Sequence, residues 1–173
     1  MAELTLSAHQ TMTLRESTQD LLEVETVYAP AGSAPPEHFH PAQDEHFEVL
    51  EGEVEVRLDG RTRTLRQGET LDVPRGVRHQ MWNPGDRSAR VRWQTRPAGR
   101  TEQWFRAIDA LHRQGALRAD GSPQPLAFAV IATEYRDVFR LAAAPWAVLR
   151  PALAVLALVG RMQGYKRHPQ RGA

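Results

Sequence analysis

The sequence has no cysteine, a single lysine and almost no net charge. Without cysteine, disulfide scaffolds, cysteine zinc fingers, iron–sulfur clusters and thiol catalysis are all excluded. The 22 Lys and Arg residues nearly cancel the 21 Asp and Glu residues, which leaves a formal charge of +1. A nucleic-acid protein needs a basic stripe to displace phosphate counterions, and these interspersed charges form none. We therefore expect no nucleic-acid partner.

Long apolar runs are also missing. Residues 1–6 lack the cationic and apolar regions of a secretion signal, so a cytoplasmic location is the default expectation. The uninterrupted apolar stretch at residues 152–160 is much shorter than the ~20 residues of a spanning helix. Arg150 and Pro151 stand directly before it. We expect no membrane partner.

What is present is typical of one soluble globular domain. The chain has 173 residues, of which 41% are hydrophobic and 25% are charged. This composition excludes global disorder and a collagen-like fibre. At this length, folding hides roughly two-thirds of the surface of the unfolded chain, so a real core can form.

The first hundred residues alternate between apolar and polar side chains, for example at residues 22–26, 54–58 and 90–93. This period of two, in short runs separated by turns, is typical of half-buried antiparallel strands. Asp59-Gly60 is a type I′ hairpin signal, and residues 83–86 (Asn-Pro-Gly-Asp) form another turn. The pattern predicts a mainly β sandwich or barrel over residues 1–97.

After Pro97 the period becomes helical, which predicts a C-terminal α-helical extension over residues 98–173. A first helix begins near Thr101 and ends before Gly115, and a second begins at Pro125. The second helix is predicted to carry one apolar stripe: Phe128, Ile131, Tyr135 and Val138.

A third apolar segment covers residues 146–159. Because Pro151 removes a backbone donor and disfavours a helical Arg150, we expect a bent or broken pair of short helices. Four of its side chains are predicted to be buried against the strands, the other helices or a second subunit: Leu149, Leu153, Leu156 and Val159. The extension as a whole would add core, cover a mouth of the barrel or form a subunit interface.

Two clusters hold the residues with metal-ligand chemistry. His38 and His40 share one face of a strand, and a hairpin would bring Glu45 opposite both rings. His79 follows on a later strand. Three imidazoles and one carboxylate suit one divalent transition-metal ion, namely Fe, Mn, Ni, Co, Cu or Zn. Alternation sends Asp44 to the opposite face, although a tighter turn would make it the ligand instead.

The same alternation predicts an apolar pocket beside the metal. If Glu45 faces inward, so do Phe47 and Val49, and if His79 faces inward, so does Met81. Trp93 joins them from the last strand of the sheet. His46 is predicted to face outward with Asp44. Each apolar residue taken alone is more simply explained as plain barrel core.

The spacing of these residues resembles the two motifs of the cupin superfamily. His38, His40, Glu45 and Gly52 match the first motif, and a second set matches the second: Gly68, Pro74, Gly76, His79 and Asn83. Both motifs are complete and the gap between them is short, as in compact bacterial cupins. The resemblance covers roughly residues 20–96 and implies an antiparallel β-barrel (a double-stranded β-helix, or jelly roll) with His38, His40, Glu45 and His79 as metal ligands.

The resemblance leaves two classes of function open. One is a metal-dependent enzyme, a dioxygenase-like oxidoreductase with Fe(II) or Mn(II) or an isomerase, acting on a small apolar or aromatic molecule. The other is a non-catalytic module that binds or senses a small molecule. Cupins are often dimers, which predicts a homodimer. Serine-hydrolase, nucleotide-binding and His-Glu-x-x-His motifs are all missing from the sequence.

Overall fold

The computed structural model describes residues 3–118 and 123–165. Its strands form two antiparallel sheets. In spatial order, the first contains β1 (Glu3–Ser7), β2 (Gln10–Ser17), β3 (Leu22–Tyr28), β10 (Ala89–Arg96), β5 (Asp44–Glu51) and β8 (Thr70–Val73). In the same order, the second contains β11 (Arg140–Leu141), β4 (His38–Phe39), β9 (His79–Trp82), β6 (Glu53–Leu58) and β7 (Arg61–Arg66).

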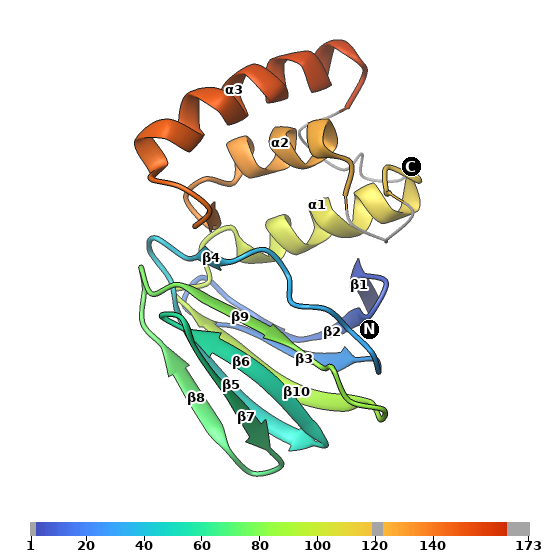
Figure 1. The fold of residues 1–173 in the computed structure, drawn as a ribbon, viewed down its shortest axis with the longest axis vertical. Helices are drawn as coiled ribbons and strands as arrows, with labels where there is room; N and C mark the ends of the chain where they lie inside the picture. The colour runs from blue at the N-terminus through green and yellow to red at the C-terminus, as the bar shows by residue number, and fades with distance from the viewer. Residues whose placement is uncertain (1–2, 119–122, 166–173) are drawn as a thin grey trace.

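Three helices follow the strands of the barrel: α1 (Thr101–Arg113), α2 (Pro125–Glu134) and α3 (Trp146–Met162). Figure 1 shows them stacked on one side of the strands, with α1 nearest the sheets and α3 farthest away. α1 contacts β1, while α2 packs along α3. The helices therefore form a layered extension over one side of the barrel.

Alternating side chains build the shared core between the two sheets. On β5, Phe47 and Val49 are buried, and on β6, Val54 and Val56 are buried. The polar residues between them face outward, as the period of two requires. The predicted mainly β jelly-roll barrel with a C-terminal helical extension is confirmed. The boundary between residues 97 and 98 stays a prediction.

Two turns take the geometry that their residues favour. Asp59 and Gly60 have φ angles of +44° and +79°, as a type I′ hairpin turn between β6 and β7 requires. Gly52, between β5 and β6, has a φ of +73°, and a Cβ there would lie 2.8 Å from the backbone oxygen of Ser88. The glycine of the first motif therefore serves a close backbone approach as well as a turn.

The helical predictions need two corrections. α2 ends at Glu134, so Tyr135 and Val138 lie beyond the helix, although both are buried in the same core cluster as Ile131. α3 is one continuous helix with Pro151 inside it, so the predicted break is wrong. The missing hydrogen bond of Pro151 is offset by the contact of α3 with α2 along the helix.

The buried side of α3 also differs from the prediction. Leu153, Ala157 and Gly160 are its buried residues. The burial of Leu153 confirms the prediction, whereas Ala157 and Gly160 are buried because their small side chains let the helix approach α2 closely. Within this chain Leu156 and Val159 are 40% and 39% exposed, so neither the strands nor the other helices bury them, and their burial against a second subunit stays a prediction. None of the helices in residues 3–118 and 123–165 has both the length and the apolar character needed to cross a membrane.

Candidate metal centre

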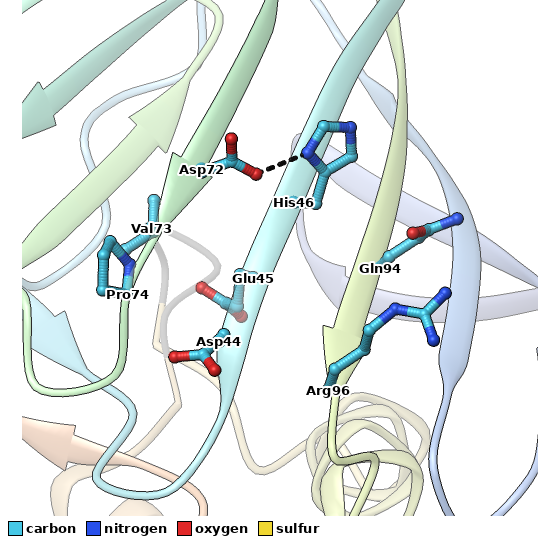
Figure 2. Close-up of a pocket in the computed structure, with 8 residues that line it drawn as sticks. All are labelled: Asp44, Glu45, His46, Asp72, Val73, Pro74, Gln94 and Arg96. Carbon is cyan, nitrogen blue, oxygen red and sulfur yellow. Dashed lines mark hydrogen bonds and ion pairs between the residues drawn. The ribbon is translucent and has the colours of Figure 1, made fainter.

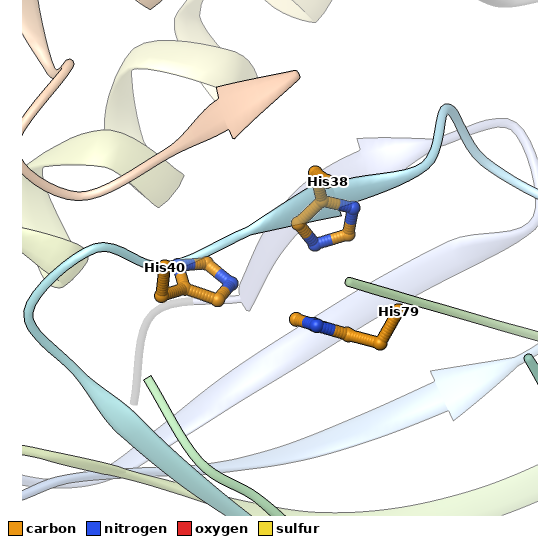
Figure 3. A group of neighbouring side chains, drawn as sticks. All are labelled: His38, His40 and His79. Carbon is orange, nitrogen blue, oxygen red and sulfur yellow. The ribbon is translucent and has the colours of Figure 1, made fainter. Parts of the chain in front are cut away.

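Three histidines meet between β4, β9 and the start of the turn into β5. His38 lies directly opposite His79 in the pairing of β4 with β9, and His40 follows β4 by one residue. One nitrogen from each ring lies within 4.8 Å of the others. Figure 3 shows the three rings directed toward one another. The pairing of β4 with β9 thus brings His38 and His40 next to His79, although His79 lies far from them in the sequence.

Glu45 reaches the same point from the other sheet. Its Oε1 lies 3.1 Å from Nε2 of His40, and its Oε2 lies 3.0 Å from Nε2 of His79. The indole Nε1 of Trp93 donates a hydrogen bond of 3.1 Å to Oε1 of the same carboxylate. Glu45 and Trp93 belong to the first sheet and the histidines to the second, so the cluster bridges the two sheets.

Each imidazole is oriented through its other nitrogen. The Nδ1 atoms of His38, His40 and His79 lie 3.0, 2.6 and 3.1 Å from backbone carbonyls. The accepting carbonyls belong to Pro36, Val138 and Val77, in that order. Because a carbonyl only accepts, each Nδ1 carries the proton, and in a neutral ring Nε2 is left with a lone pair.

Burial sets the charge state of the cluster. It lowers the pKa of His38 and of His40, so both rings are neutral near pH 7. Burial also lowers the pKa of His79, but the facing carboxylate of Glu45 outweighs it and raises that pKa. Burial raises the pKa of Glu45, yet His40 and His79 outweigh it and lower this pKa to about 2. An ionised carboxylate is therefore enclosed by two neutral rings, those of His38 and His40, and by His79, whose protonation the carboxylate favours.

This donor set fits a metal ion. In the neutral Nδ1–H tautomer, Nε2 of His40 has no proton to donate to Oε1 of Glu45, which lies 3.1 Å away. This nitrogen, and Oε2 of Glu45 despite its 3.0 Å approach to Nε2 of His79, are buried without a hydrogen-bond partner among the described residues. Leaving such groups unpaired is costly, and more so for a charged one. A cation between the lone pairs of the rings and the carboxylate would satisfy both. The three histidines present the neutral nitrogens that transition metals bind, and Glu45 supplies compensating negative charge.

Asp44 and His46, the neighbours of Glu45 on β5, face away from the histidine cluster. Nδ1 of His46 lies 2.7 Å from Oδ1 of Asp72, and Asp44 forms an ion pair with Arg75. The regular alternation of β5 therefore keeps Asp44 away from the histidines, and Glu45 is the carboxylate that reaches them.

The residues predicted to line a pocket all lie in the common core of the barrel. Phe47, Val49, Met81 and Trp93 are buried there, and the rings of Phe47 and Trp93 are 5.3 Å apart. Of the four, Trp93 has a direct polar contact with the cluster, through Glu45. A role for them in substrate binding stays a prediction.

A cleft of about 430 Å³ lies on the outer face of the sheet, along β5, β8 and β10. Figure 2 shows the residues that line it: Asp44, Glu45, His46, Asp72, Val73, Pro74, Gln94 and Arg96. Of its polar side chains, His46 pairs with Asp72, Asp44 with Arg75 and Gln94 with Glu23, whereas the histidine cluster contains buried acceptors without a partner among the described residues. The histidine cluster is therefore the better candidate site.

Two contacts from the extension reach the site without any signal in the sequence. The carbonyl of Val138 accepts from His40, and the ring of Phe139 stacks on that of His38, with centroids 4.8 Å apart. Val138 is predicted on a helical stripe, and Phe139 belongs to no predicted feature. A backbone carbonyl has no signature in a sequence, so spacing alone could not have found the first contact.

The comparisons with known proteins agree with this geometry. Residues 24–94 match the family model described as a cupin domain. "Polyketide synthase CurC" of Streptomyces cyaneus is 46% identical over 55 residues, which are 32% of this chain and 36% of that protein. "Tetracenomycin polyketide synthase protein TcmJ" of Streptomyces glaucescens is 39% identical over 66 residues, 38% of this chain and 44% of that protein. The chain thus spans less than half the length of either relative.

A solved structure has the same fold. KdgF from Halomonas sp. superimposes with a TM-score of 0.50 at 21% sequence identity, covering 56% of this chain and 86% of that chain. Both histidine motifs fall inside the segment that matches the family model. Residues 24–94 therefore form a cupin domain, which assigns this segment of the chain to the cupin superfamily.

Proposed function

We propose that this protein binds one divalent transition-metal ion through His38, His40, Glu45 and His79 and is a metal-dependent enzyme. One observation carries the proposal: three imidazoles held through Nδ1 bring one nitrogen each within 4.8 Å of one another, and two of them, His40 and His79, direct Nε2 toward the buried carboxylate of Glu45. A structural core has no need for such an arrangement, because burying four polar side chains costs more than burying apolar ones. The cost is offset if a cation is bound.

The donor set narrows the metal to Fe, Mn, Co, Ni, Cu or Zn, since imidazole nitrogens suit these ions. We favour Fe(II) or Mn(II) and a dioxygenase-like oxidoreductase. A bound ion of this kind supplies Lewis acidity or redox chemistry to a substrate beside it. The other expected class, an isomerase, would use the same four residues.

The chain itself contributes orientation and polarity. The carbonyls of Pro36, Val77 and Val138 hold the rings in one tautomer, which makes Nε2 a better donor. The indole of Trp93 holds Glu45 toward the histidines. Apolar side chains of the barrel interior exclude water around these groups, which strengthens every electrostatic contact there.

The substrate class follows from the barrel interior and from the relatives. Phe47, Val49, Met81 and Trp93 make the barrel core apolar and aromatic, and Trp93 contacts Glu45 directly, which suits an apolar or aromatic molecule. Two of the relatives reported above are named as polyketide synthase proteins. We therefore extend the proposal to a small aromatic compound of polyketide type.

The proposal is tested first by metal content. Purified protein is analysed by inductively coupled plasma mass spectrometry, and the His40→Ala variant is compared with His46→Ala. We expect close to one equivalent of metal in the wild type and in His46→Ala, whose ring lies on the outer face. His40→Ala should lose the metal. Equal metal content in both variants would overturn the assignment of this site.

Catalysis is tested separately, by oxygen consumption and product analysis with small aromatic polyketides. Turnover in the wild type and its loss in His40→Ala support the enzyme. Binding of the same compounds without turnover, under a range of metals, would instead support the non-catalytic module. Homodimer formation and a cytoplasmic location both stay predictions.

A further inference from the structure

A short segment of the extension lies directly against the ligand strand. We name residues 138–141, which follow α2 and end with β11, the clasp segment. β11 pairs antiparallel with β4, with Arg140 opposite Phe39 and Leu141 opposite His38. The next residue, Ala142, donates its N–H to the carbonyl of Glu37 at 2.9 Å. The ligand strand β4 is therefore held between β9 on one side and the clasp segment on the other.

The clasp segment also determines how His40 is turned. Nδ1 of His40 donates to the carbonyl of Val138 at 2.6 Å, and both groups are buried. This hydrogen bond fixes the tautomer and the rotation of the ring, so Nε2 faces Glu45. The corresponding carbonyls for His38 and His79 come from Pro36 and Val77, two residues away in the chain. His40 alone of the three takes its acceptor from the extension.

His38 is held by a stack of three rings. Phe139 lies nearly parallel to His38, with centroids 4.8 Å apart and an interplanar angle of 25°. On its other side Phe139 lies against Trp104 of α1, at 4.7 Å and 20°. Trp104 and Phe139 are both buried, so neither ring has room to turn aside. Trp104 of α1 thus holds the ring of Phe139, and Phe139 in turn fixes the plane of the His38 ring.

We infer that the clasp segment is part of the metal centre and that Phe139 is a positioning residue for His38. The inference rests on the proposed metal site and adds to it the groups that fix its geometry. Contacts that orient a ligand contribute to metal affinity without touching the metal, and their loss typically costs about 10–100-fold. The extension therefore belongs to the working site rather than serving only as added core.

The test uses the full-length protein and three single substitutions. Phe139→Leu keeps an apolar side chain but removes the ring face that stacks on His38. Phe139→Tyr keeps the ring. Phe128→Leu is the matched control, because Phe128 contacts Trp104 and Phe139 in the same aromatic cluster. Among the described residues, no ring contact joins Phe128 to a histidine of the site.

Two readouts separate positioning from stability. Affinity for Co²⁺ and Mn²⁺ is measured by calorimetry, and the visible absorption spectrum of the Co²⁺ protein reports the geometry around the ion. Thermal unfolding is recorded for every variant in the metal-free state. We expect Phe139→Leu to weaken affinity by about tenfold and to change the Co²⁺ spectrum. Phe139→Tyr should restore both, and Phe128→Leu should change neither, although it lowers the unfolding temperature.

The possible outcomes distinguish failure of the positioning role of Phe139 from failure of the proposed metal site. If Phe139→Leu matches Phe128→Leu in both affinity and spectrum, the positioning role is overturned while the metal site stands. If the wild type binds neither Co²⁺ nor Mn²⁺ at this site, the proposed function fails and the inference falls with it. A Phe139→Tyr variant as impaired as Phe139→Leu would also contradict a role for ring stacking.

Discussion

The barrel and the helical extension contribute to the same site in different ways. The barrel supplies the four candidate ligands and the indole that holds Glu45. The extension supplies no candidate ligand among the residues that the structure describes, yet its backbone and one of its rings orient two of the three imidazoles. The candidate ligands thus come from the barrel alone, whereas the residues that orient them come from both parts of the chain.

This division shows what a motif does and does not record. The two cupin motifs mark the side chains that meet and the turns that let them meet. They do not mark the groups that hold those side chains in place, because Val138 acts through its backbone and Phe139 lies outside both motifs. Four experiments test how far the two regions are separable.

The largest effect should follow loss of a ligand from the barrel. A metal that binds only the native state raises the free energy of unfolding by ~4 kcal/mol at a thousandfold excess over Kd. We expect this increment in the wild type and none in His79→Ala. The measurement is chemical denaturation with and without Mn²⁺, and His46→Ala is the control that keeps the increment.

The same experiment tests whether the scaffold stands without metal. The apolar core of the two sheets is continuous around the site, so the metal-free wild type and His79→Ala should both stay folded by circular dichroism. A chelator that unfolds the wild type at room temperature would contradict the separation of scaffold and site.

A second substitution disturbs the extension without touching the clasp segment. In Gly160→Ala the new Cβ would lie 2.7 Å from the carbonyl oxygen of Leu126 and 2.9 Å from Cγ2 of Val130. Forcing α3 away from α2 should cost about 1–3 kcal/mol of stability. Metal affinity should stay within about twofold, because the clasp contacts come from residues before α3.

The control for this substitution is Ala154→Ser, at an exposed position of the same helix. It should leave both stability and affinity near the wild-type values. Should Gly160→Ala weaken metal binding as strongly as Phe139→Leu, the orienting contacts would not be confined to the clasp segment.

A third substitution removes the orienting contact that the barrel itself makes. Trp93→Phe keeps an aromatic ring but loses the Nε1–H that donates to Glu45 at 3.1 Å. We expect about tenfold weaker Mn²⁺ binding, comparable to the effect of Phe139→Leu. Trp82→Phe, at a β9 ring that lies beside Arg57, should bind as the wild type does. Unchanged affinity in Trp93→Phe would contradict a positioning role for its indole.

The smallest effect concerns the ion pair beside the clasp segment. Asp137 pairs with Arg100, and both side chains are about half exposed. Burial raises the pKa of Asp137, but the hydrogen bond with Arg100 outweighs it and lowers that pKa below the ordinary value. After screening by solvent, Asp137→Asn should cost less than about 1 kcal/mol of stability at pH 7.

The sign of the pH dependence follows from this shift. A carboxyl with a lowered pKa in the folded state stabilises the fold above its unfolded pKa. That contribution disappears as the pH falls through the lower folded pKa. The difference in unfolding free energy between wild type and Asp137→Asn should therefore be present at pH 7 and vanish in strong acid. A difference that grows on acidification would contradict the assignment.

The sequence predicted the barrel well because its signals are local. Alternation along β5 distinguished Glu45 from Asp44 and His46, and Asp59-Gly60 marked its hairpin correctly. Strand period and turn conformation depend on neighbouring residues, so they can be read without knowledge of the rest of the chain. The spacing of the two motifs then predicted correctly that His79 lies with His38 and His40.

The extension was predicted less well because its details depend on distant contacts. The continuity of α3 through Pro151 depends on α2, and the side of α3 that is buried depends on Ala157 and Gly160 fitting against it. The strand β11 has two residues, too few to show the alternation of apolar and polar side chains that identifies a strand in a sequence. It forms because β4 lies beside it. Local pattern carries no information about such partners.

The most direct test is a crystal structure of the Mn²⁺ protein with anomalous scattering recorded for the metal. We expect one anomalous peak about 2.0–2.2 Å from Nε2 of His38, His40 and His79, with Glu45 as the fourth ligand. The Nδ1 atom of His40 should still donate to Val138, and Phe139 should still stack on His38. A peak beside His46 and Asp72, or ligation through Nδ1 with the clasp contacts broken, would contradict a metal centre built jointly by barrel and extension.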